Sequence, residues 1–82
     1  MKFSAEYQAL SKLIDKLREK HEKVEEIISE REDYFSEKSG RWQESEAGYN
    51  YSEKTEDFEA TAGAIENVLD SLEDALSTLE EL

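Results

Sequence analysis

A repeat of apolar residues in steps of four and three runs through residues 3–42, which read FSAEYQALSKLIDKLREKHEKVEEIISEREDYFSEKSGRW. We call this line of positions the first seam. Its members are Phe3, Tyr7, Leu10, Ile14, Leu17, His21, Val24, Ile28, Arg31, Phe35, Lys38 and Trp42. Nine of the twelve are apolar. A heptad pattern of this length predicts a long helix that packs against another helix.

A second seam follows after a short break. Its members are Tyr51, Thr55, Phe58, Ala62, Ile65, Leu69, Leu72, Leu76 and Leu79. Gly48-Tyr49-Asn50 interrupts the pattern, and Asn50 or Ser52 is a suitable N-cap for a second helix. We therefore predict a helix over about 4–46, a loop over about 47–51 and a helix over about 52–80. Ser39-Gly40 is the place where a kink or an early stop would fall.

Two helices joined by a short loop fold back on each other, so the sequence predicts an all-α antiparallel hairpin. A loop centred on Tyr49 would place Phe35 opposite Ala62. At ~1.5 Å per residue, the first helix would be about 60 Å long and the second about 45 Å. The longer helix would then leave four residues without an intrachain partner, and we expect these at a dimer interface: Phe3, Tyr7, Leu10 and Leu13.

Both predicted helices also carry apolar residues beside the seam. These are Leu13, Ile27 and Tyr34 on the first helix and Val68, Ala75 and Leu82 on the second. So wide an apolar stripe suits a bundle of more than two helices. A chain of 82 residues also buries little surface by itself. The sequence therefore predicts a homodimeric four-helix bundle.

Charge is distributed unevenly along the chain. Residues 1–31 carry seven basic and seven acidic residues, whereas residues 32–82 carry three and fifteen, so the net charge of −12 lies in the second part. Such an acidic surface repels nucleic acid and anionic membrane, and we expect it to bind neither directly. The first residues are not followed by an apolar run, so we expect no secretory signal, no membrane span and a cytoplasmic location.

Motifs of catalysis or cofactor binding are missing from the sequence. The chain has no cysteine, which excludes disulfides and thiolate metal sites. Its one histidine, His21, lies on the first seam and lacks the Glu-x-x-His spacing of helix-bundle metal sites, so we expect it to be structural. There is no phosphate-binding loop or calcium loop. We predict a protein without catalytic residues, metal or cofactor.

The second predicted helix is rich in acids. It carries Glu53, Glu56, Asp57, Glu59, Glu66, Asp70, Glu73, Asp74, Glu80 and Glu81, and Lys54 is the one cation among them. This is one acid per ~4 Å of helix, close to the ~3.4 Å spacing of phosphates along a DNA strand. We predict a partner-binding surface that includes the first eight. The alternative is a face that serves only solubility.

Six of the eight aromatic residues lie between positions 34 and 58. We expect Phe35 and Phe58 to pack inside the end of the hairpin. Trp and Tyr are common anchors at interfaces, so we predict that Trp42, Tyr49 and Tyr51 form an exposed binding patch.

The segments Arg41-Trp42-Gln43-Glu44-Ser45-Glu46-Ala47-Gly48 and Tyr51-Ser52-Glu53-Lys54-Thr55 resemble a stretch of small helical proteins encoded by tailed bacteriophages. The resemblance implies a phage accessory protein, a class in which acidic helical inhibitors of host DNA-binding and defence proteins are common. It assigns no functional residues. The sequence thus favours a non-enzymatic binding protein that mimics nucleic acid, and the rival hypothesis is a structural or assembly coiled-coil module.

Overall fold

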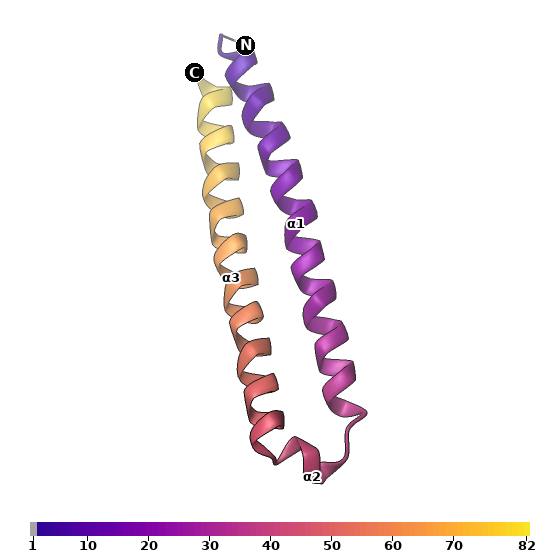
Figure 1. Cartoon of the computed structure of the whole chain (residues 1–82). Coiled ribbons are helices and arrows are strands. Elements are labelled where there is room, and N and C mark those ends of the chain that lie inside the picture. The colour runs from indigo at the N-terminus through magenta and orange to yellow at the C-terminus, as the bar shows by residue number, and fades with distance from the viewer. Residues whose placement is uncertain (1) are drawn as a thin grey trace.

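The computed structural model describes residues 2–82 and contains three helices, α1 (Ser4–Ser36), α2 (Gly40–Gln43) and α3 (Glu46–Glu81). The long helices α1 and α3 lie side by side and run antiparallel, with both termini at one end and the short α2 at the other (Figure 1). The molecule measures 62 × 15 × 12 Å. The predicted all-α helical hairpin is confirmed. We call residues 31–58 the tip, and residues 4–30 with 59–81 the shaft.

The seam positions that lie in α1 and α3 form the contact between these two helices. Every position of the two seams is buried or half-buried, because steps of four and three keep these side chains on one stripe of each helix. The enclosed part of this contact is small. Among the described residues, the buried apolar side chains are Ile14, Ala62 and Leu69.

The predicted boundaries at the tip were wrong. α1 ends at Ser36 and not near residue 46, and residues 47–51 belong to α3. The turn falls at Ser39-Gly40, the alternative position, because two serines start new helices there. The Ser39 hydroxyl accepts a hydrogen bond from the Trp42 amide, and the Ser45 hydroxyl accepts one from the Gly48 amide, both at 3.2 Å.

The end of α1 is closed by a residue of α2. The Gln43 side-chain amide donates hydrogen bonds to the carbonyl oxygens of Phe35, at 2.9 Å, and Lys38, at 3.1 Å. The Phe35 carbonyl lies in the last turn of α1, where carbonyls lack a partner inside the helix, and it also accepts a hydrogen bond from the Lys38 amide at 3.2 Å. Lys38 itself lies beyond the end of α1. Gln43 therefore anchors the turn to the helix that precedes it.

The early turn removes the predicted overhang. α1 has 33 residues and α3 has 36, so the two helices match in length. Phe3, Tyr7 and Leu10 are half-buried seam residues, and only Leu13 of the predicted dimer set stays exposed, at 59%. The inference that these four residues lack an intrachain partner was wrong for the first three.

The register of the hairpin shifts for the same reason. Arg31 of α1 is hydrogen-bonded to Thr55 and Tyr51 of α3. Phe35, one turn nearer α2, lines a hollow with Ser52 and Thr55. Ala62 lies about two turns from Thr55 in the opposite direction, so the predicted contact between Phe35 and Ala62 was wrong.

Candidate partner-binding face

The hairpin has two long sides, and one of them is acidic. If the heptads are lettered so that the seam occupies a and d, the e positions of both helices flank the seam on one side and the g positions on the other. The charged residues at the e positions are Arg18, Glu25 and Glu32 on α1 and Glu59, Glu66, Glu73 and Glu80 on α3. An ion pair between Arg18 and Glu73 shows that these two flanks meet. We call this side the acidic face.

The acidic face continues around the outside of α3. Of the ten acids from Glu53 to Glu81, all except Asp57 occupy the adjacent b, e and f positions, so they form one continuous strip along the helix. All ten are exposed except Glu73, which is half-buried beside Arg18. The structure thus brings together the predicted partner-binding acids of α3 with the exception of Asp57.

These acids contribute little to holding the hairpin together. Within residues 2–82, Glu73 is the one acid of α3 that has an ion-pair partner, and the other ion pairs lie inside α1. Glu80 and Glu81 stand in the last turn of α3, which contains no basic residue. Negative charge at a helix C-terminus is unfavourable because it adds to the negative end of the helix dipole.

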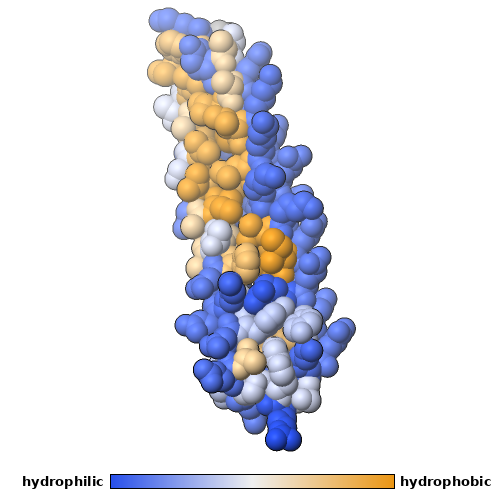
Figure 2. All heavy atoms as spheres, viewed as in Figure 1, coloured by the Kyte–Doolittle hydropathy of each residue, from blue (hydrophilic) through white to orange (hydrophobic). Residues whose placement is uncertain are grey.

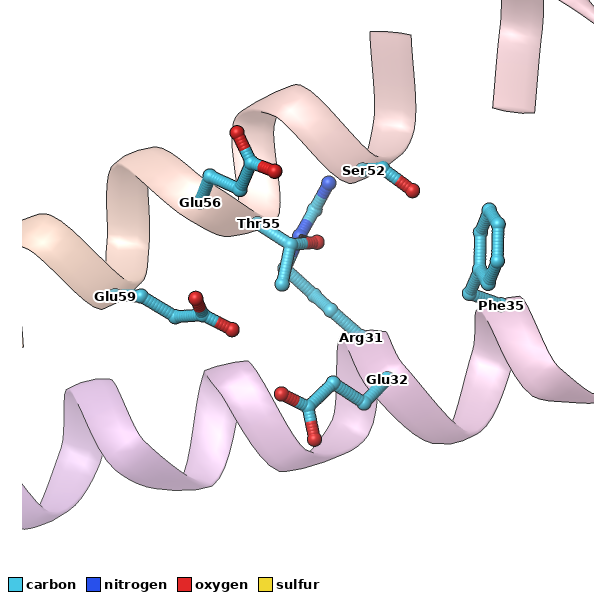
Figure 3. A pocket seen from close by; sticks show the side chains of 7 residues that line it. All are labelled: Arg31, Glu32, Phe35, Ser52, Thr55, Glu56 and Glu59. Atoms are coloured by element: carbon cyan, nitrogen blue, oxygen red, sulfur yellow. Dashed lines mark hydrogen bonds between the residues drawn. The ribbon is translucent and has the colours of Figure 1, made fainter. Parts of the chain in front are cut away.

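A hollow of about 280 Å³ opens on the acidic face near the tip. Figure 3 shows Glu32 of α1 and Glu56 and Glu59 of α3 around it, with Arg31 reaching across from α1 towards α3. The three glutamates come from both helices, so like charges converge here with a single guanidinium between them. The hollow is therefore suited to a cation and not to an anion.

Arg31 is committed to the fold. Its Nε donates to Thr55 Oγ1 at 2.9 Å, and a terminal nitrogen donates to the Tyr51 carbonyl at 3.0 Å. Its guanidinium lies 3.9 Å from the centroid of the Tyr51 ring and 5.4 Å from that of Phe58. The seam pattern places Arg31 and Thr55 on the two contact stripes without pairing them. Pairing the two would have located the turn correctly.

The three residues of the predicted aromatic patch do not form one exposed surface in the structure. The Trp42 ring packs edge-on against Tyr34, Phe35 and Tyr51, with centroids 6.2, 5.9 and 5.9 Å away. Trp42 and Tyr51 are thus half-buried packing residues and were wrongly expected to be exposed. Tyr49 is 64% exposed and precedes Glu56 by two turns, which places it at the end of the acidic strip.

His21 is largely enclosed by the seam. Its side chain is 13% exposed, and Nδ1 lies 3.0 Å from a carboxylate oxygen of Glu25. Over residues 2–82, no group of three or more His, Cys, Asp or Glu side chains is placed to hold a metal ion. In the same part of the chain, no helix combines the length and apolar character that crossing a membrane requires. No protein-family model, curated protein or solved structure matches the chain.

Proposed function

We propose that this chain is a non-enzymatic binding protein whose acidic face occupies the basic groove of a nucleic-acid-binding protein. The observation that carries the proposal is the continuous strip of α3 acids, which, apart from Glu73, are exposed and have no ion-pair partner within residues 2–82. A charge row of this kind attracts a basic surface over long distances and accepts charge-assisted hydrogen bonds from Arg and Lys. Tyr49, exposed at the end of the strip, adds an aromatic anchor.

We propose that the protein is a bacteriophage accessory protein that acts in the host cytoplasm. There it would inhibit a host nucleic-acid-binding or defence protein. The support is the resemblance of residues 41–48 and 51–55 to small phage proteins, together with the acidic face. An inhibitor of this type needs no catalytic group, since occupying the groove of its target is sufficient.

We also propose that the protein acts as a homodimeric four-helix bundle. Among the described residues, the buried apolar side chains are Ile14, Ala62 and Leu69, whereas Leu13, Ile27 and Val68 are exposed beside the seams on the side away from the acids. A dimer joined on that side would carry its two acidic faces outward, available to partners.

The second candidate is a structural or assembly module in which the acids serve only solubility. Its support is the row of exposed apolar side chains on α1 and α3, which would mediate assembly. The two candidates differ in what the acids do. Neutralising a few acids removes partner binding if they form the binding surface, and changes nothing if they only solubilise the protein.

A capture experiment from bacterial extract, with duplex DNA as competitor, tests the acidic face. The variant Glu66→Gln/Asp70→Asn/Asp74→Asn leaves the Arg18–Glu73 ion pair intact. We expect the wild-type protein to retain DNA-binding proteins that duplex DNA or added salt displaces, because both compete for the same charges. The triple variant should retain at least tenfold less of these proteins.

The matched control is Glu19→Gln/Glu22→Gln/Glu30→Gln on α1, which changes the charge by the same amount, at exposed positions without ion pairs in the described chain. Capture by this variant should equal that of the wild type. Circular dichroism should show equal helicity in all three proteins. The proposal fails if the α3 variant retains the same proteins as the wild type, or if DNA does not displace them.

A further inference from the structure

We infer that the side of the hairpin opposite the acidic face binds a second copy of this chain. This apolar face consists of the g positions of the two helices. Its apolar members are Leu13, Ile27 and Tyr34 on α1 and Val68, Ala75 and Leu82 on α3. Figure 2 shows this side as a band of apolar atoms along the shaft, bordered by hydrophilic atoms. The inference rests on the proposed dimer and is independent of what the acidic face binds.

The apolar face covers a core that one chain leaves unfinished. Leu13, Val68 and Leu82 are 59%, 50% and 68% exposed, and Ile27 and Tyr34 are 37% and 44% exposed. Beneath them, the seam residues Leu17, Ile65 and Leu72 are only half-buried. In a four-helix bundle, residues beside the a and d positions form the layer between the two hairpins. The apolar face supplies this layer from both helices.

Two adjoining hollows show where the covering side chains would sit. One, of about 370 Å³, is lined by Leu13, Lys16, Leu17, Lys20 and Leu72. The other, of about 270 Å³, is lined by Leu17, Thr61, Ala64, Ile65 and Val68. Leu17 belongs to both, so the hollows form one groove between α1 and α3. Their surfaces are almost wholly apolar, which suits aliphatic side chains of an equally apolar face.

The side of the molecule that carries the apolar face is large enough for a stable interface. The whole side measures 62 by 15 Å over the Cα atoms and has a footprint on the order of 900 Å² per copy, and the apolar face is the part of it along the shaft. A standard interface buries about 800 Å² per partner. Such an interface has an apolar centre and a polar rim. Here the centre is the apolar face and the rim is formed by the outer charges of α1 and α3.

The distribution of charge favours this side for contact between two copies. With a net charge of −12, two chains repel each other unless their acids stay apart. The strip of α3 acids lies on the opposite side, and the groove itself is bordered by Lys16 and Lys20. Contact through the apolar face therefore keeps the acid strips apart and brings these two lysines near the negative partner. A second copy is the occupant that satisfies the apolar area and the charge together.

Sedimentation equilibrium of the wild type and the variant Leu13→Glu/Val68→Glu tests the inference. The wild type should have about twice the monomer mass of 9.5 kDa. Both substituted residues are at least half exposed in the hairpin, so the fold of one chain tolerates the carboxylates. In a symmetric dimer each substitution is present in both copies, so four carboxylates would be buried at the interface. The dissociation constant should therefore rise at least ~100-fold.

The control Ala5→Glu/Ala60→Glu adds the same charge at exposed, outward positions and should keep the dimer. The variant Leu13→Ala/Val68→Ala keeps high helix propensity and should weaken the dimer about tenfold. It therefore tests the same surface even if the Glu variant does not fold.

A monomeric, helical wild type overturns both the dimer and this surface. A dimer that survives both Leu13/Val68 variants, or that the control disrupts equally, overturns the surface alone. Neither result affects the capture experiment on the acidic face.

Discussion

The tip and the shaft of this hairpin are stabilised in different ways. The tip uses directional contacts: the Ser39 and Ser45 caps, the Gln43 amide on the end of α1, and Arg31 between Thr55 and the Tyr51 ring. The shaft depends on apolar side chains that follow a heptad pattern and are mostly half-buried. The tip thus fixes which residues of α1 and α3 face each other, whereas the shaft supplies burial that one chain leaves incomplete.

The largest effect should come from the best-buried side chain of the shaft. Ile14 is 2% exposed, so Ile14→Ala leaves a cavity and removes apolar contacts. We expect a loss of about 2 to 4 kcal/mol in the free energy of unfolding, measured by urea denaturation. A loss below about 1 kcal/mol, as for an exposed aliphatic residue, would show that the shaft does not enclose this position.

A smaller loss should come from Gly48 in the tip, where two segments of backbone approach closely. Gly48 is buried in the first turn of α3, and a Cβ there would overlap the carbonyl oxygens of Trp42 and Gln43. Because both are backbone atoms, Gly48→Ala should cost about 1 to 3 kcal/mol in the same urea experiment.

The matched control is Gly63→Ala in the shaft, where a Cβ would have no atom within 4 Å. This substitution should stabilise the protein by up to ~1 kcal/mol, because alanine has the higher helix propensity. If the two substitutions shift stability equally, the tip is no more tightly constrained than the shaft.

The sequence was sufficient to predict the shaft, because a period of 3.5 residues leaves little choice of contact face. The tip was not predictable in the same way. Lys38 and Trp42 continue the four-three steps of Phe35 beyond the end of α1, since the α2 turn folds Trp42 back onto the rings of Tyr34 and Phe35. The heptad pattern in the sequence therefore extends beyond the end of the helix. Short-range capping by Ser39 and Ser45 decided the boundary.

The candidate site was predictable in part. Assigning the α3 acids to heptad positions places all but Asp57 on one strip, and this step needs only the sequence. The burial of Trp42 and Tyr51 required the structure, because an aromatic residue that anchors an interface and one that packs a turn look alike in sequence. Their neighbours Tyr34 and Phe35 come from α1, so the contact depends on where the turn falls.

Small-angle X-ray scattering is the most direct test of the claim that the shaft is completed by a second copy. Two hairpins stacked along their apolar faces should double the scattering mass while the maximum dimension stays close to that of one hairpin, which is 62 Å long over its Cα atoms. The cross-section should thicken instead. A doubled mass with nearly doubled length, as in end-to-end association, or a monomer mass at all concentrations, would contradict the account.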